Sequence, residues 1–260
     1  MKKKTIARKH ITALAGKMSR WKSPYFLIES FIKLYIRYYK IQLNDYDFSF
    51  EKGISFHDFF TRKLKPGSRS ITGNFISPVD GTITALGIAD SCSKIPAKSQ
   101  QFTFEELTGC VIEDVFPISY AVIYLSPADY HRIHAPFALQ VSTITHIEGC
   151  HYPVHLKSQM KRDSLFCQNE RVVLSGTCEY GRYWFVLIGA MIVGSVYLSF
   201  TGTLHSKDAA SLWGCNYQLN TGDEIGYFAL GSTVVLFVEG NRLKHNSSLP
   251  KPVKLGDAME

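Results

Sequence analysis

Residues Tyr183–Leu204 read YWFVLIGAMIVGSVYLSFTGTL and contain no charged side chain. A run of this length could cross a bilayer as one helix. However, Gly189, Gly194 and Gly202 interrupt it, and serine and threonine are interleaved with valine, isoleucine and aromatic residues. Glycine breaks and β-branched residues are typical of buried strands. We therefore predict two strands joined near glycine, and no transmembrane helix.

The chain beyond residue 70 has the same character. Short segments rich in valine, isoleucine and threonine are punctuated by glycine, proline and asparagine, and they do not alternate with helical segments. This pattern argues against a doubly wound parallel sheet. We predict an α+β protein with a helical region over residues 1–60 and a mainly antiparallel, β-rich domain over 61–260. The predicted strands are Gly81–Leu86, Tyr120–Leu125, Leu139–Ile147, Glu170–Leu174, Phe185–Ile188 and Thr233–Val238.

Charge is unevenly distributed along the chain. The whole sequence carries a net charge of +7, but residues 1–40 carry +10 and the remaining 220 residues carry −3. A basic surface over the whole fold is therefore excluded, and we predict no nucleic-acid partner. Six cysteines form no Cys-x-x-Cys pair. This argues against a zinc ribbon or a disulfide framework and favours reduced thiols in the cytosol.

The basic N-terminal segment contains a predicted helix. Ser23 and Pro24 are residue types typical of an N-cap and a first helical turn. Beyond them the segment is mostly tyrosine, phenylalanine, leucine and isoleucine, with one narrow charged stripe formed by Glu29, Lys33, Arg37 and Lys40. A broad apolar face beside basic residues favours a helix lying on an anionic membrane surface. The alternative is a helix packed on its own domain or on a dimer partner.

Two histidines lie in the segment LSPADYHRIHAP, residues 125–136, which starts with typical helix-capping residues and ends in proline. Ser126, Pro127 and Asp129 have the order of a capped helix start. We predict about two helical turns, with His131 and His134 on one face. Such a pair could bind a metal, exchange protons or lie on the surface.

Two further candidates are an aspartate and a glycine–serine step. Asp80 occupies a turn just before a strand, and it would fix the tautomer of His134 if the two were adjacent. Gly231 and Ser232 interrupt an apolar strand. The pair is typical of a β-bulge, but it also leaves the Gly231 carbonyl open to attack by the Ser232 hydroxyl.

Taken together, these motifs resemble a known family. SPVDGTI at 77–83, YHRIH at 130–134 and LGST at 230–233 resemble, in order and spacing, the bacterial membrane-associated phosphatidylserine decarboxylases. The resemblance covers about residues 55–240, and the first 50 residues match only in being basic and helical. Supporting motifs are FFTRKLKP at 59–66, NERV at 169–172, GAMIVGS at 189–195 and GDEIG at 222–226.

The resemblance implies a proenzyme that cuts its own backbone between Gly231 and Ser232. Ser232 would be the nucleophile, His134 the base that takes its proton, and Asp80 the carboxylate that orients His134. The peptide bond becomes an ester, and elimination then cuts the chain and leaves a dehydroalanine. This rearranges and is hydrolysed, which releases ammonia and leaves a pyruvoyl group in place of Ser232.

The implied products are a β chain of residues 1–231 and an α chain of residues 232–260 headed by the pyruvoyl cofactor. The pyruvoyl would form a Schiff base with phosphatidylserine, and His131 would return a proton after carbon dioxide leaves, giving phosphatidylethanolamine. No metal is implied. The implied location is peripheral, on the cytoplasmic side of the cell membrane, with the anionic membrane surface as a partner. The α and β chains would form a heterodimer, and further dimerisation stays open.

Two other kinds of protein fit the same residues. One is a zinc hydrolase that uses His131, His134 and either His151 or His155. The other is a non-catalytic lipid-binding protein, which would stay a single chain.

Overall fold

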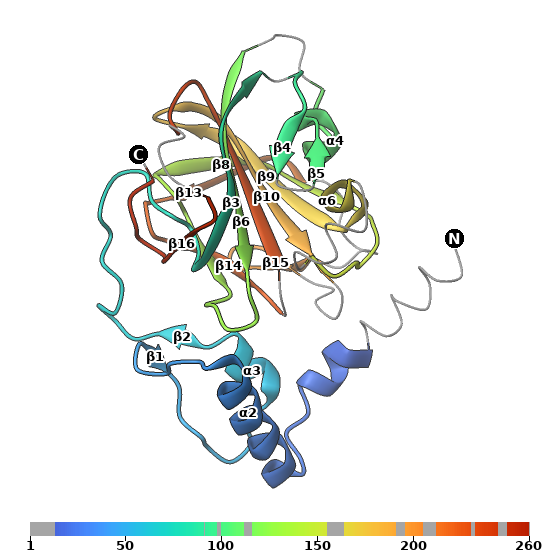
Figure 1. Cartoon of the computed structure of the whole chain (residues 1–260), viewed down its shortest axis with the longest axis vertical. Coiled ribbons are helices and arrows are strands. Elements are labelled where there is room, and N and C mark those ends of the chain that lie inside the picture. Colours follow the sequence, from blue (N-terminus) through green and yellow to red (C-terminus); the bar gives the residue numbers. More distant parts are fainter. Residues whose placement is uncertain are drawn as a thin grey trace.

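Antiparallel β-sheet dominates the computed structural model of the chain (Figure 1). The strand ladders among the described residues are all antiparallel. This confirms the predicted mainly antiparallel α+β class. The structure describes residues 14–90, 92–97, 100–111, 116–154, 164–190, 196–204, 212–229, 232–243 and 249–259.

The largest sheet has eight strands in the order β13-β8-β9-β10-β15-β6-β3-β16. Its central strands are apolar on both faces, as expected for strands covered on both sides. The six predicted strands all belong to this sheet, with ends that differ by a few residues. The bounds are β3 Gly81–Asp90, β6 Pro117–Leu125, β8 Leu139–Ile147, β9 Arg171–Cys178, β10 Gly181–Gly189, β13 Leu212–Leu219, β15 Ser232–Glu239 and β16 Lys251–Val253.

A smaller sheet of four strands has the order β12-β11-β14-β7. Its strands are β7 Arg132–His134, β11 Val196–Leu198, β12 Gly202–Leu204 and β14 Glu224–Phe228. A hairpin of β4 (Ile95–Ala97) and β5 (Gln100–Phe102), and the short helices α4 (Phe104–Thr108) and α6 (Leu165–Gln168), complete this part of the chain.

The uncharged run over residues 183–204 forms strands, as predicted, but it contributes to three of them rather than two. β10 takes its first part, and β11 and β12 form a tight hairpin in its last part. Residues 191–195, which lie between β10 and β11, are outside the described residues. None of the helices in the described ranges is long and apolar enough to span a bilayer.

The N-terminal helices gather into a lobe below the large sheet in the view of Figure 1. The lobe has its own small core, which includes Ile32, Phe56 and Phe59. The predicted helix is present, but Pro24 rather than Ser23 occupies the N-cap position, and no side chain caps the helix. The lobe's elements are a helical turn at residues 14–19, α2 Tyr25–Tyr39, β1 Tyr46–Asp47, α3 Phe56–Phe60 and β2 Lys63–Leu64.

Candidate active site

Strand register brings Ser232 and the Asp80 turn to the same end of the large sheet. Ser232, the first residue of β15, lies opposite Leu125 of β6 and Gly189 of β10. On the other side of β6, Thr82 of β3 lies opposite Tyr124, so Asp80 precedes β3 at the same level. Strands lie about 4.8 Å apart, so the Ser232 and Asp80 backbones are about 10 Å apart across β6.

The small sheet places His134 beside the Asp80 turn and His131 beside the end of β14. His134 of β7 lies opposite Glu224 of β14, and its backbone N–H donates to the Pro78 carbonyl at 2.9 Å. At the other end of the pair, Phe228 N–H donates to the His131 carbonyl at 3.0 Å. β14 ends at Phe228, shortly before Ser232.

The helix predicted for residues 125–136 is wrong, because β7 pairs with β14 instead. The local capping signals are present: the Asp129 carboxylate accepts from Ser126 N–H at 2.6 Å, and Asp129 N–H donates to the Ser126 carbonyl at 3.0 Å. They close a turn and not a helix. His131 lies just before β7 and His134 ends it, so the two do not share the helix face that was predicted.

His134 is held as a neutral base. Its Nδ1 lies 2.8 Å from the Gly222 carbonyl oxygen, which can only accept, so Nδ1 carries the proton and Nε2 carries the lone pair. The Tyr130 hydroxyl, 3.1 Å away, donates to Nε2. Burial lowers the pKa of His134, and the nearby charge of Arg132 lowers it further. The imidazole can therefore accept a proton at neutral pH.

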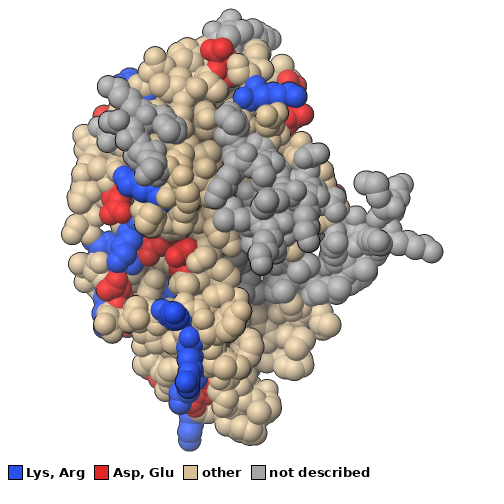
Figure 2. All heavy atoms as spheres, in the orientation of Figure 1, with Lys and Arg blue, Asp and Glu red and all other residues tan. Residues whose placement is uncertain are grey.

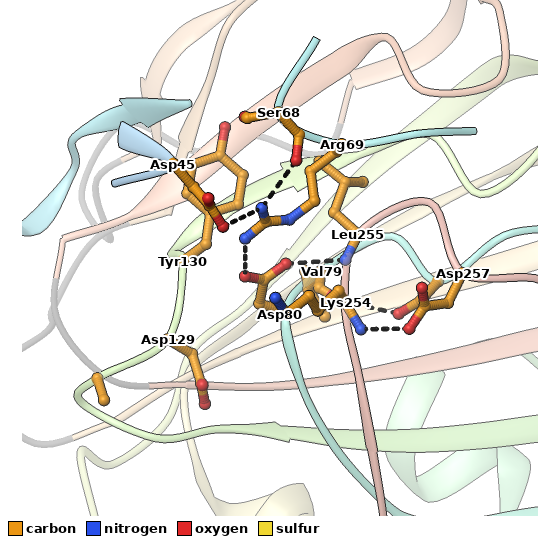
Figure 3. A network of polar contacts seen from close by, with 12 residues as sticks. Asp45, Ser68, Arg69, Val79, Asp80, Asp129, Tyr130, Lys254, Leu255 and Asp257 are labelled. Carbon is orange, nitrogen blue, oxygen red and sulfur yellow. Dashed lines mark hydrogen bonds and ion pairs between the residues drawn. The ribbon is translucent and has the colours of Figure 1, made fainter. Parts of the chain in front are cut away.

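The Asp80 carboxylate is held by groups other than His134 (Figure 3). Oδ2 accepts from Nη2 of Arg69 at 2.8 Å, and Oδ1 accepts from the backbone N–H of Leu255 at 2.8 Å. Its negative charge still acts on His134 and favours the protonated imidazole. Sequence reasoning missed both partners. A buried carboxylate signals that some cation lies near it, but not which one.

Ser232 is fully buried, and its hydroxyl has no hydrogen-bond partner among the residues the structure describes. A buried polar group without a partner is costly and uncommon outside reactive sites. Gly231, the other residue of the predicted cleavage site, lies outside the described residues.

The comparisons with known proteins agree on one family. The sequence model described as phosphatidylserine decarboxylase matches residues 56–259. A phosphatidylserine decarboxylase proenzyme of Chromobacterium violaceum is 35% identical over 96% of this chain and 93% of its own length. Those of Marinobacter nauticus (35%; 95% and 92%) and Myxococcus xanthus (31%; 96% and 93%) are similar. The chain belongs to the phosphatidylserine decarboxylase family.

In this family member, His131 is the more deeply buried of the two histidines. It is 1% exposed and packs against the Phe60 ring, with 4.1 Å between the ring centroids. Nδ1 donates to the Asp129 carbonyl at 2.8 Å, so the lone pair is on Nε2, which has no partner within the described ranges. Burial, and the charge of Arg62, lower the pKa of His131 to about 3. To act as a proton donor from Nε2, His131 must first take up a proton there.

The histidines weighed as zinc ligands are not gathered into one cluster in the described part of the decarboxylase. His151 lies 3.0 Å from a Glu170 oxygen, and His146 lies 3.1 Å from the other oxygen of the same carboxylate. Among the described residues, no group of three or more His, Cys, Asp or Glu side chains is placed to hold a metal ion. His155 is outside them.

Proposed function

We propose that the chain is a phosphatidylserine decarboxylase proenzyme that cuts itself between Gly231 and Ser232. It then removes the carboxyl group of phosphatidylserine as carbon dioxide, and phosphatidylethanolamine is the product. The observation that carries the proposal is the buried Ser232 hydroxyl, without a partner among the described residues, at the end of the large sheet that also holds the Asp80 turn, beside which His134 lies.

In the self-cleavage step, the Ser232 oxygen attacks the Gly231 carbonyl carbon and the bond from that carbon to the Ser232 nitrogen breaks. The backbone is then joined through an ester. His134, neutral with a lone pair on Nε2, takes the hydroxyl proton once the Tyr130 hydroxyl has released that nitrogen. The charge of Asp80 stabilises the imidazolium that forms.

The pyruvoyl cofactor of the family fits residue 232. It forms from Ser232 itself, and a buried hydroxyl without a partner among the described residues, at the head of a strand paired on both sides, supports this. When present, a pyruvoyl group supplies an electron-withdrawing carbonyl that stabilises the negative charge left by carbon dioxide. His131, buried beside Phe60, would take up a proton at Nε2 and then deliver it to the substrate carbon.

Cleavage would leave two chains that stay together. β15, which belongs to the α chain of residues 232–260, pairs along its length with β10 on one side and β6 on the other. β16 of the same chain pairs with β3. Removing the α chain would therefore open the middle of the large sheet, so a stable heterodimer is expected.

The region of residues 1–60, which includes α2 and α3 of the lobe, is proposed to dock on the cytoplasmic face of the cell membrane. One side of α2 packs into the lobe, but the other side exposes large apolar side chains, including Phe26 (65% exposed), Leu34 (65%) and Tyr38 (75%). An apolar groove of about 660 Å³ runs between residues 15–39 and α3. Figure 2 shows basic side chains running down the lobe on the face in view. Exposed apolar side chains beside basic ones suit an anionic bilayer.

Release of carbon dioxide from vesicles that contain phosphatidylserine tests the proposed activity. The purified wild-type protein should convert phosphatidylserine to phosphatidylethanolamine without any added metal or cofactor. Ser232→Ala, which lacks the hydroxyl that gives rise to the pyruvoyl group, should be inactive. A folded, self-cleaved wild-type protein that releases no carbon dioxide from these vesicles would contradict the proposal.

A further inference from the structure

The Asp80 carboxylate is fixed on both of its oxygens. Arg69 Nη2 donates to one and the Leu255 N–H to the other, each at 2.8 Å. The Asp80 and Arg69 side chains are each only 9% exposed. Hydrogen bonds to an ionised group are shorter and stronger than neutral ones. Two such bonds from opposite sides fix both the place and the plane of the carboxylate (Figure 3).

Arg69 is itself held in place. Nη1 donates to Asp45 Oδ2 at 2.7 Å and to the Ser68 carbonyl at 3.1 Å. Asp45 belongs to the lobe, between α2 and β1. The guanidinium therefore ties the lobe to the Asp80 turn through one rigid, planar group.

Leu255 lies in the C-terminal tail, residues 249–259, which pairs with β3 through β16 and then runs along residues 72–77. Ser77 N–H donates to the Asp257 carbonyl at 2.8 Å, and Lys254 N–H donates to the Asp257 carboxylate at 2.7 Å. Gly256 has a φ of +93°, and a Cβ there would meet the Ser70 carbonyl oxygen. This tight turn aims the Leu255 N–H at Asp80.

The Leu255 side chain reinforces the same arrangement. It is buried in a small cluster with Tyr46, Ile76 and Tyr130. Tyr130 is the residue whose hydroxyl donates to His134 Nε2. The tail thus contacts the site twice, through its backbone at Asp80 and through its side chain at the neighbour of His134.

We propose that Arg69 and the Leu255 N–H are positioning groups for Asp80 in self-cleavage, which makes the C-terminal tail a working part of the cleavage site. The inference rests on the proposed function, in which His134 takes the Ser232 proton. A carboxylate fixed at this place keeps its charge directed at His134 as the imidazolium forms, without reorganisation during the reaction. Ser232 and Leu255 belong to the same fragment, so both ends of the α chain stay at the site after cleavage.

The test compares self-cleavage rates of newly synthesised protein, followed on denaturing gels. Arg69→Gln should slow cleavage about 10–100-fold, the loss typical when the partner that orients a functional side chain is removed. Arg69→Lys keeps the positive charge and a donor for Asp80 but loses the planar fork that also binds Asp45, so it should recover only part of that loss. Asp45→Asn is the matched control, because its amide oxygen can still accept from Nη1, and it should be cut at the wild-type rate.

Two substitutions of Leu255 test the role of its backbone N–H in the tail. Leu255→Ala trims the buried side chain but keeps the N–H, whereas Leu255→Pro removes the N–H. Leu255→Pro should be cut more slowly than Leu255→Ala by about the factor expected for Arg69→Gln. Melting temperatures, measured on each variant with Ser232→Ala added, show whether the chains are folded.

Three results would overturn the inference alone, provided that wild-type protein cuts itself. They are cleavage of Arg69→Gln at the wild-type rate, equal slowing by Arg69→Lys and Arg69→Gln in folded protein, and equal rates for the two Leu255 variants. A wild-type chain that is never cut would overturn the proposed function, and the inference with it.

Discussion

Burial sets the protonation state of both histidines beside the candidate cleavage site. Each ring donates from Nδ1 to a backbone carbonyl, so each keeps its lone pair on Nε2. His134 has the Tyr130 hydroxyl and the charge of Asp80 near it, which suits a base that must become charged for a moment. His131 lies deeper, against Phe60, and has no carboxylate among the groups that shift its pKa. These different surroundings support different roles.

A His131→Ala variant distinguishes the proposed role of His131 in decarboxylation from that of His134 in self-cleavage. We expect it to cut itself at a normal rate, because the proposed base for cleavage is His134. It should then make phosphatidylethanolamine about 10²–10⁴-fold more slowly, the usual contribution of a positioned general acid. Denaturing gels measure the first reaction and carbon dioxide release the second. A fully processed, stably folded His131→Ala enzyme with nearly wild-type activity would assign the proton transfer to another group.

The lowered pKa of His131 also predicts how stability changes with pH. With a pKa of about 3 in the folded chain and an ordinary value near 6.5 when unfolded, His131 binds a proton in the unfolded state first. Below about pH 6.5 the free energy of unfolding should therefore fall as pH falls, with His131 contributing about 1.4 kcal/mol per pH unit. Denaturant unfolding of Ser232→Ala protein, which stays one chain, measures this slope. Adding His131→Asn should reduce this slope by about 1.4 kcal/mol per pH unit, the value for one proton. An unchanged slope would show that the pKa of His131 is not lowered in the folded chain.

Sequence patterns selected the candidate site residues but not their hydrogen-bond partners. Neighbouring turn, capping and glycine residues, together with the family resemblance, drew attention to Asp80, His131, His134 and Ser232. Their hydrogen-bond partners are set by contacts that no local pattern carries: the Leu255 N–H is 175 residues from Asp80, and the Gly222 carbonyl is 88 residues from His134. Such pairings arise only when distant strands meet.

At the scale of elements, strands were predictable and the segment around the histidines was not. Periodic apolar residues identified six strands of the large sheet, because burial on a pleated sheet imposes that pattern, but β13 at Leu212–Leu219, as long as β9, was missed. The capping signals at Ser126 and Asp129 are real, yet the residues after them pair with β14, and Arg132 binds Glu224, which is 92 residues away. Long-range pairing thus outweighed a local preference worth about 1 kcal/mol.

The exposed apolar side of α2 is the proposed membrane contact, and substitutions on it test that role. Replacing Phe26, Leu34 and Tyr38 together by glutamate should weaken binding to vesicles of phosphatidylserine and phosphatidylcholine by 100-fold or more, because each apolar side chain contributes about 1.5–3 kcal/mol when fully buried. These side chains are exposed, so self-cleavage should be unaffected.

The matched control replaces two exposed apolar residues of the β-rich domain, Ile88 and Val111, by glutamate. It should bind vesicles as wild type does. Equal loss of binding in both variants, or in neither, would place the membrane contact on another surface or assign the apolar side of α2 to a dimer partner.

At the scale of the whole molecule, the fold ties the proposed reaction centre to three distant parts of the chain. The lobe reaches Asp80 through Arg69, the small sheet supplies both histidines, and the C-terminal segment supplies Ser232 at one end and Leu255 at the other. The division at residue 60 stays a prediction, since β2 at Lys63–Leu64 still pairs with β1 of the lobe. A cut at residue 231 would leave all these contacts in place.

The mass spectrum of the purified protein tests the central claim most directly. We predict two components under denaturing conditions, residues 1–231 and a fragment of residues 232–260 whose first residue is a pyruvoyl group and therefore lacks a free amino terminus. Under native conditions the two should remain together. Ser232→Ala should give one intact chain, and His134→Ala and Asp80→Asn should give intact or very slowly cut chains. A wild-type protein of 260 intact residues, or normal cutting of Ser232→Ala, would contradict the account.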